Sequence, residues 1–160
     1  MEITTQRLSI KLLKADDWKI IKEIWQDFDS SPYAGYDRPH SNDDEEIKAI
    51  VEGFAKTECF YIVLLRDENK AIGMLCLHGT DNGYDIGYTF LSQHYRKGYA
   101  KESCKALIDH YVKKGCRRFC AGTALKNIPS VMLLRSLGFK QTGTEQVSFY
   151  KDDNGNDIYF

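Results

Sequence analysis

The sequence predicts one α/β domain with a mixed central sheet of about seven strands and about four helices. Strand-like and helix-like segments follow one another in the order β-α-α-β-β-β-α-β-α-β-β, which favours a sheet covered by helices. A strand over 84–90, a helix over 98–114 and a strand over 119–125 form a βαβ crossover, which requires two parallel strands. The 160 residues show no linker or internal repeat, so we expect a single domain over residues 1–160.

The N-terminal part predicts one strand and two helices. Apolar and polar residues alternate over 8–13, as in a half-buried strand. Asp16 then caps a helix with four apolar side chains on one face: Trp18, Ile21, Trp25 and Phe28. Residues 29–42 are rich in turn-forming residues and predict a loop. Ser41 and Asp44 resemble a capping box before a second helix with an apolar face: Ile47, Ile50, Val51 and Phe54.

The central part predicts three consecutive strands. Apolar segments over 60–65 and 71–77 are joined by a polar turn at 67–70. A second hairpin turn, Asp81-Asn82-Gly83, leads into the strand over 84–90.

The C-terminal part completes the crossover and adds a hairpin. The helix over 98–114 stops at Gly115, a typical residue for a helix C-terminus. A strand over 119–125 follows, and then a short helix that begins at Pro129. Residues 144–160 hold two strand-like segments around a polar turn, and we expect this hairpin to close the sheet.

Composition and charge argue against several classes of function. The chain is 42% hydrophobic and 12% aromatic, as in a globular protein. Because its formal net charge is −1 and it has no basic stripe, we expect neither nucleic acid nor a membrane as a partner. The sequence shows no apolar leader and no membrane-spanning run, so we expect a cytoplasmic protein.

The cysteines and histidines predict neither disulfides nor a metal site. The cysteines are five, an odd number, and include no Cys-x-x-Cys pair. Four lie among apolar residues, where reduced thiols act as small hydrophobic groups: Cys59, Cys76, Cys104 and Cys120. This pattern indicates a reducing compartment. The four histidines show no spacing typical of metal ligands.

A first candidate site lies at the start of the helix over 98–114. The N–H groups of the first helical turn have no intrahelical partners and therefore attract an anion such as a diphosphate. Gly98 lets an anion approach the backbone, and Arg96 and Lys97 add positive charge at the rim. The alternative is that Gly98 is only a turn residue and the two cations are solvated surface groups.

A second candidate site follows the strand over 119–125. Asn127 lies just past the end of this strand, at the edge where open α/β sheets bind ligands. Ser130 opens the next helix and directs its hydroxyl toward the same crevice. The alternative is that both residues are helix caps, which is a common role of these residue types.

Taken together, these segments resemble the GNAT N-acetyltransferase superfamily, and most closely its branch of ribosomal-protein N-terminal (alanine) acetyltransferases. The resemblance extends from residue 4 to about residue 160. It rests on four ordered motifs: Thr5-x-Arg7-Leu8, Asp85-Ile86-Gly87-Tyr88, the segment 95–102 and Asn127-x-x-Ser130 followed by Leu137-Gly138-Phe139.

The resemblance implies a single GNAT-like domain that binds acetyl-coenzyme A where the parallel strands 84–90 and 119–125 splay apart. Backbone groups near two residues would pair with the pantetheine arm: Phe90 and Leu91. The diphosphate would lie against the helix start: Tyr95, Arg96, Lys97, Gly98, Tyr99, Ala100 and Lys101. Asn127 and Ser130 would lie beside the thioester.

Two positions depart from the family pattern. Tyr95 stands where many members carry Gln or Arg, so a phosphate or backbone contact is missing. Leu134 stands where many members place a tyrosine that protonates the departing thiolate. The resemblance therefore implies that Ser130 or an ordered water supplies this proton.

The implied reaction is direct attack of an amine on the thioester, without a covalent enzyme intermediate. Two carboxylates are candidates for the base, acting through a water: Asp85, which points away from the main core, and Glu145. Each is equally explained as a solvated charge. Backbone N–H groups around Leu91 are candidates for stabilising the oxyanion. Acidic residues over 27–46 suggest a cationic acceptor, or simply a solvated loop and helix start.

We therefore expect an N-acetyltransferase that uses acetyl-coenzyme A and acts on a protein N-terminus or a small amine, with a possible homodimer. The alternative is a non-catalytic module that binds or senses acetyl-coenzyme A, because the tyrosine expected at position 134 is missing. A third interpretation, a general nucleotide-binding domain, predicts no preference for acetyl-coenzyme A over ADP.

Overall fold

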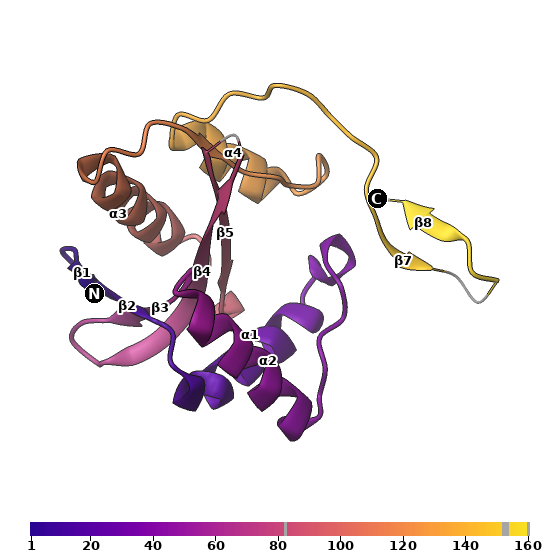
Figure 1. The fold of residues 1–160 in the computed structure, drawn as a ribbon, viewed down its shortest axis with the longest axis horizontal. Coiled ribbons are helices and arrows are strands. Elements are labelled where there is room, and N and C mark those ends of the chain that lie inside the picture. Colours follow the sequence, from indigo (N-terminus) through magenta and orange to yellow (C-terminus); the bar gives the residue numbers. More distant parts are fainter. Residues whose placement is uncertain (82, 152–153, 160) are drawn as a thin grey trace.

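The computed structural model describes residues 1–81, 83–151 and 154–159. Within these ranges, six strands form one sheet and two more form a separate sheet (Figure 1). The strands of the large sheet, in their spatial order, are β1 (Glu2–Thr4), β2 (Leu8–Leu12), β3 (Phe60–Leu65), β4 (Lys70–Thr80), β5 (Gly83–Phe90) and β6 (Phe119–Cys120). The small sheet pairs β7 (Ser148–Lys151) with β8 (Asp157–Tyr159).

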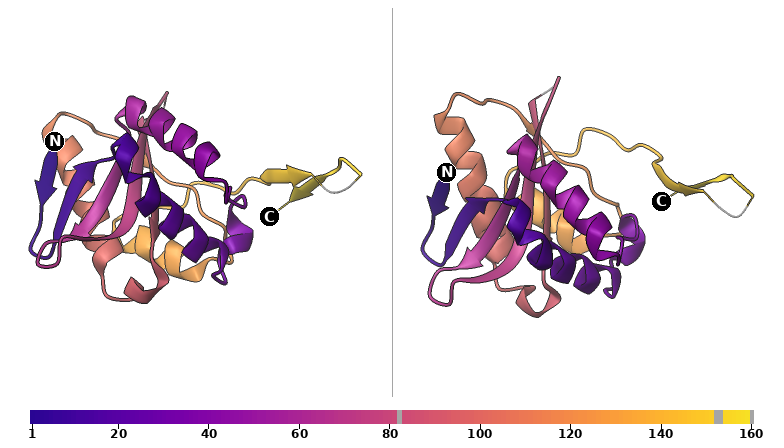
Figure 2. Two further views of the ribbon diagram at one scale, coloured as in Figure 1. Left: turned by 90° about the horizontal axis from the view of Figure 1, so that it is seen from below. Right: turned by 60° about the horizontal axis from the view of Figure 1, so that its bottom comes forward.

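Helices cover both faces of the large sheet. The α-helices are α1 (Trp18–Asp29), α2 (Asp44–Thr57), α3 (Tyr99–Lys113) and α4 (Ile128–Ser136), and three short 3-10 turns are η1 (Ala15–Asp17), η2 (Ala34–Tyr36) and η3 (Ser92–His94). In Figure 1, α1 and α2 lie below the sheet as drawn, and α3 and α4 lie above it. The two further views in Figure 2 show α3 on the other side of the strands from α1 and α2.

The predicted βαβ crossover is confirmed. The strands from β1 to β5 pair antiparallel in order, whereas β5 and β6 are parallel and are joined through α3. The parallel register is short, since it joins only Tyr84 to Phe119 and Asp85 to Cys120. The mixed sheet that the sequence predicts is therefore present, with its parallel pair at one edge.

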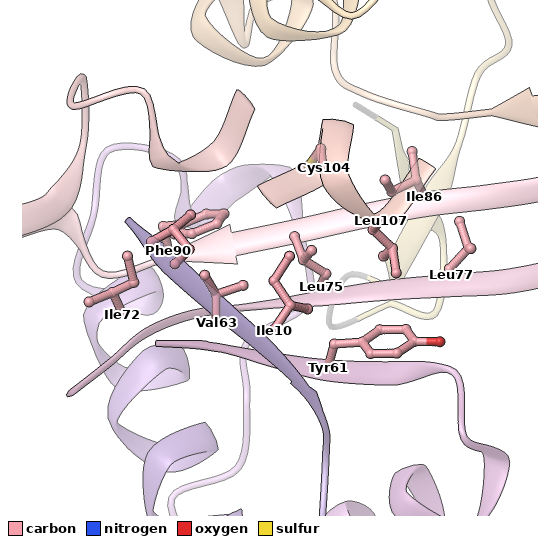
Figure 3. Packing of buried hydrophobic residues seen from close by; sticks show 11 residues of the cluster. Ile10, Tyr61, Val63, Ile72, Leu75, Leu77, Ile86, Phe90, Cys104 and Leu107 are labelled. Atoms are coloured by element: carbon pink, nitrogen blue, oxygen red, sulfur yellow. The ribbon is translucent and has the colours of Figure 1, made fainter. Parts of the chain in front are cut away.

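The main core lies between the sheet and α3. Side chains that alternate along the middle strands meet one face of α3, as expected for period-two strands against an amphipathic helix. Figure 3 shows this packing, with labelled residues from β2, β3, β4, β5 and α3: Ile10, Tyr61, Val63, Ile72, Leu75, Leu77, Ile86, Phe90, Cys104 and Leu107. A second cluster lies under α1 and α2 and includes Ile21, Trp25, Ile47 and Val51.

The structure corrects three expectations. The strand predicted over 119–125 ends at Cys120, because the chain turns away to cap α4. The predicted loop over 29–42 contains η2. A further strand, β1, was not predicted, since three residues are too short to show a period.

The C-terminal hairpin does not close the sheet as expected. In the part of the chain that the structure describes, β7 pairs with β8 and neither pairs with the large sheet. Figure 1 shows the hairpin extending away from the body of the molecule. Alternation along the sequence indicates a strand but does not specify its neighbour, which explains the error. Asn82 and the pair Asp152–Asp153, which belong to predicted turns, lie outside the described residues.

Candidate active site

The early end of β6 leaves part of β5 with an unpaired edge. The N–H of Tyr84 donates to the carbonyl of Arg118 at 3.0 Å, which shows that even-numbered residues of β5 direct their main-chain groups toward β6. Since β6 stops at Cys120, no described strand pairs with the main-chain groups of Tyr88 and Phe90 on this side. Unpaired N–H and C=O groups along a strand edge can bind an extended ligand.

Leu91 differs from Phe90 in this respect. Its N–H donates to the carbonyl of Ile72 in β4 at 2.9 Å, and its own carbonyl accepts from the N–H of His94 at 2.9 Å. Both main-chain groups of Leu91 are therefore already used within the protein. Of the two residues predicted to pair with a ligand, only Phe90 has main-chain groups that face the unpaired edge of β5 in the described structure. Tyr88, which was not predicted, also has main-chain groups that face this edge.

The start of α3 lies directly after this edge. Gly98 is the N-cap residue and has φ +81°, and the N–H of Glu102 makes the first intrahelical bond to its carbonyl at 3.0 Å. The N–H groups of the first turn, residues 99–101, have no intrahelical acceptor. Arg96 and Lys97 are exposed at the rim. The predicted cluster over 95–101 is thus brought together at one helix N-terminus, where an anion is favoured.

Asn127 is a helix cap, as the simpler interpretation proposed. Its side-chain oxygen accepts from the N–H of Ser130 at 3.3 Å, and its carbonyl accepts from Val131 at 3.0 Å. These bonds fix the first turn of α4 beside the open edge of β5.

Ser130, in α4, contacts β5 beside the unpaired edge. Its hydroxyl lies 2.7 Å from the hydroxyl of Tyr88, so the two groups form a hydrogen bond between α4 and β5. Burial raises the pKa of Tyr88 to about 12, although the bond to Ser130 opposes this rise. The phenol is therefore neutral at physiological pH and can donate a hydrogen bond.

Tyr88 is a candidate site residue that the sequence did not reveal. The motif Asp85-Ile86-Gly87-Tyr88 was recognised, but an aromatic residue that alternates with Ile86 and Phe90 is typical of a core position. The only available signal was its hydroxyl, because a buried tyrosine hydroxyl usually finds a partner.

Asp85 lies on the opposite face of β5 from Tyr88, because side chains alternate along a strand. Its register partner in β4 is His78. Burial raises the pKa of Asp85 above its ordinary value, and the charge of His78 opposes the rise. The structure therefore places a carboxyl group of raised pKa on the part of β5 that pairs with β6, where Cys120 is its register partner.

Glu145 is placed differently. It is exposed and lies in the irregular segment between α4 and β7. Within the part of the chain that the structure describes, Glu145 does not contact β5. The structure thus separates the two carboxylates that the sequence suggested as bases.

Most acidic residues of the stretch 27–46 have structural partners. Asp27 accepts from the N–H and hydroxyl of Ser92 at 2.6 and 2.7 Å, which ties α1 to the segment after β5. Others serve caps or ion pairs in the same region: Asp29 with His40, Asp43 with the N–H of Glu46, Asp44 with Lys22, Glu45 with Lys48 and Glu46 with Ser41.

Asp37 is the exception. It is exposed, and its side chain accepts only the adjacent N–H of Arg38 among the hydrogen bonds of the described residues. Among the acidic residues of this stretch, Asp37 is thus the one whose carboxylate is held only by the backbone N–H of the next residue in the part of the chain that the structure describes.

The described residues contain no group of three or more His, Cys, Asp or Glu side chains that could hold a metal ion. Among them there is also no helix long and apolar enough to cross a membrane.

A family comparison agrees with this architecture. Residues 7–140 match the model of the acetyltransferase (GNAT) domain. Since this match covers most of the chain, the protein belongs to the GNAT acetyltransferase family and is an acetyltransferase.

Two sequence relatives are bacterial N-acetyltransferases. The chain is 28% identical over 165 residues to the uncharacterized N-acetyltransferase YnaD of Bacillus subtilis (strain 168), covering 100% of this chain and 95% of the relative. It is 27% identical over 150 residues to the uncharacterized N-acetyltransferase p20 of Bacillus licheniformis, covering 87% and 82%.

Solved structures share the fold. The GNAT-family acetyltransferase from Bacillus anthracis aligns with a TM-score of 0.80 and 23% identity, over 99% of this chain and 93% of that one. RimL, a ribosomal L7/L12 alpha-N-protein acetyltransferase in complex with coenzyme A, aligns with a TM-score of 0.75 and 18% identity, over 99% and 94%. At these identities the structures show the common fold.

Proposed function

We propose that this acetyltransferase transfers the acetyl group of acetyl-coenzyme A to a primary amine by direct attack in a ternary complex. One observation carries the proposal: the hydroxyl pair of Tyr88 and Ser130 lies at the unpaired edge of β5, beside the anion-favouring start of α3. The coenzyme A bound to the structural relative RimL supports this choice of donor.

The donor fits the described residues in two parts. Its diphosphate would accept hydrogen bonds from the N–H groups of residues 99–101, with Arg96 and Lys97 neutralising charge at the rim. Its pantetheine arm would pair with the main-chain groups of Tyr88 and Phe90, as an added strand does. This placement directs the thioester toward Ser130.

The departing thiolate needs a proton, and Ser130 is placed to supply it. Leu134, at the position where the family often has tyrosine, is only 7% exposed and packs in the interior. Ser130 would donate its proton to sulfur and regain one from solvent water, while the neutral phenol of Tyr88 donates a hydrogen bond to the serine oxygen. This arrangement stabilises the charge that develops on the serine.

The attacking amine must be neutral, which favours an α-amine. At pH 7, deprotonating a lysine-type amine costs about 4.6 kcal/mol, whereas an α-amine costs about 1 kcal/mol. Asp85, through a water, would accept the amine proton from the opposite face of β5. We therefore propose a peptide N-terminus or a small amine as the acceptor. Glu145 is the second candidate for the base, although it is exposed.

The test is transfer of label from radiolabelled acetyl-coenzyme A to a panel of N-terminal peptides, polyamines, aminoglycosides and amino acids. We expect transfer to one class of primary amine. In the Ser130→Ala variant we expect turnover to fall by about 100-fold, with little change in the Kd of coenzyme A measured by calorimetry. Tight binding of coenzyme A without transfer to any acceptor would contradict the proposal, and so would a Ser130→Ala variant with unchanged turnover.

A further inference from the structure

The carboxylate of Glu102, in the first part of α3, is bound by residues from the N-terminus of the chain. Its Oε1 accepts from the hydroxyl of Thr5 at 2.6 Å and from the N–H of Arg7 at 3.1 Å. Its Oε2 accepts from Nε of Arg7 at 2.8 Å and forms an ion pair with Nη2 at 2.7 Å. Four donors from two residues, more than 90 positions away in the sequence, thus hold one carboxylate.

The guanidinium of Arg7 also contacts the loop that precedes α3. Its Nη1 donates to the carbonyl of Lys97 at 3.0 Å. Its central carbon lies 4.5 Å above the centre of the Tyr99 ring, within the range of a cation–π contact. Arg7 therefore joins three members of the segment 97–102, and it does so from behind the loop.

The loop before α3 has a left-handed backbone conformation at two positions. Arg96 has φ +59° and Gly98 has φ +81°, both in the left-handed region. This region is unfavourable for a non-glycine residue such as Arg96. A Cβ atom at Gly98 would lie 3.4 Å from Nη2 of Arg7, so the guanidinium packs closely behind the turn.

Glu102 would be unfavourable near a diphosphate if its charge were not neutralised. Burial alone would raise the pKa of Glu102, but the hydrogen bonds from Thr5 and Arg7 outweigh this effect and lower it. The carboxylate is therefore ionised at physiological pH, close to a site for an anion. Arg7 cancels this negative charge, because its guanidinium binds the carboxylate directly.

We propose that the Arg7–Glu102 ion pair is a positioning device for the diphosphate part of the acyl donor. Arg7 holds the loop 95–98 in its left-handed shape and neutralises Glu102, without itself contacting the donor. This inference rests on the proposed function, since it assumes a donor with a diphosphate. It predicts that loss of Arg7 weakens recognition of the diphosphate and leaves the chemistry at Ser130 unaffected.

The experiment compares two donors, acetyl-coenzyme A and acetyl-pantetheine, which lacks the diphosphate and nucleotide. In Arg7→Met we expect the KM for acetyl-coenzyme A to rise about 10-fold with kcat nearly unchanged. For acetyl-pantetheine we expect kcat/KM to change less than 2-fold. The double variant Arg7→Met/Glu102→Gln should recover part of the loss, because it removes the uncompensated charge. The Kd of coenzyme A, measured by calorimetry, should follow the KM values.

The matched control is Lys105→Met, which breaks the exposed ion pair of Lys105 with Asp109 on the same helix. We expect it to behave as the wild type with both donors. If Arg7→Met does not fold, the same comparison of donors uses Glu102→Gln, whose amide oxygen still accepts a hydrogen bond from Arg7 although the ion pair is lost. A change of KM confined to acetyl-coenzyme A would support the inference, and equal changes with both donors would overturn it.

Two results would overturn the inference: equal losses with both donors, which would indicate general destabilisation, or no loss with either. A wild-type protein that binds coenzyme A but transfers no acetyl group would contradict the proposed function. The calorimetric comparison of the variants would still decide the role of Arg7.

Discussion

The hydroxyl of Tyr88 lies 2.7 Å from the hydroxyl of Ser130, and this bond joins α4 to the part of β5 that extends beyond its pairing with β6. The two residues are 42 positions apart. Their pairing places a neutral proton donor behind the serine that we propose protonates the departing thiolate.

Substituting Tyr88 with Phe removes this bond and keeps the ring. We expect kcat to fall about 5- to 10-fold, because a neutral hydrogen bond contributes about 1 kcal/mol, while the KM for acetyl-coenzyme A stays nearly constant. The double variant Tyr88→Phe/Ser130→Ala should be no slower than Ser130→Ala, since the residues act together. Steady-state kinetics with the preferred acceptor measures both effects.

The control for this substitution is Tyr111→Phe. The hydroxyls of Tyr61 and Tyr111 form a partly buried hydrogen bond of 2.7 Å, the same length as that between Tyr88 and Ser130. This bond lies away from the unpaired edge of β5. Tyr111→Phe should lower the free energy of unfolding by about 1 kcal/mol without changing kcat. If both tyrosine variants changed kcat equally, the effect of Tyr88 would be one of stability.

Protonation of the Asp85 carboxylate should limit kcat/KM at low pH. Burial raises the pKa of its carboxyl group, so we expect kcat/KM to rise with pH through this raised pKa as the base ionises. Asp85→Asn should remove this limb of the pH profile and lower kcat/KM by about 100-fold.

The same pKa shift predicts an opposite effect on stability. A raised pKa in the folded state means that folding favours the protonated form, so stability is highest below the unfolded pKa and is lost as pH rises through the folded pKa. Asp85→Asn should therefore raise the Tm at pH 7 and change it little at pH 3. A lower Tm at pH 7 together with unchanged kcat/KM would assign the carboxylate a structural role.

The acidic residues over 27–46 allow a test of whether the acceptor is cationic. Asp37 is exposed, and among the described residues its side chain accepts a hydrogen bond only from the N–H of Arg38. Asp37→Asn should raise the KM of a cationic acceptor about 3- to 10-fold, the range of one weak charge interaction. Asp43 caps α2, and asparagine is an equally good cap, so Asp43→Asn serves as the control with unchanged KM. Equal KM values for all three proteins would exclude a role for the acidic stretch in acceptor binding.

The sequence predicted well the elements that depend on local pattern. The strand over 60–65 is observed with the same bounds, and α3 differs from the predicted helix by one residue at each end. Periodicity and end signals are local, so they survive in the folded protein. The start of the helix that carries the first candidate site was predicted to within one residue for the same reason.

The sequence did not reveal the contacts that connect distant segments. Thr5 and Arg7 were recognised only as part of a family motif, whereas the structure shows them bound to Glu102. Tyr88 was interpreted as a core residue because its partner, Ser130, lies on another element. The end of β6 and the position of the C-terminal hairpin likewise depend on pairing choices, which a single strand does not encode.

The close approach of Gly87 to Cys76 predicts a compensating pair of substitutions inside the sheet. The two residues are register partners in β5 and β4, and a Cβ atom at Gly87 would lie 2.6 Å from the sulfur of Cys76. Gly87→Ala should therefore lower the free energy of unfolding by about 1–3 kcal/mol through overpacking. Cys76→Ala/Gly87→Ala should recover part of this loss, because the smaller side chain makes room. Urea denaturation of the two single variants and the double variant measures this coupling. Additive losses would show that the strands move apart to accept the methyl group, and that the sulfur does not set the spacing of β4 and β5 at this point.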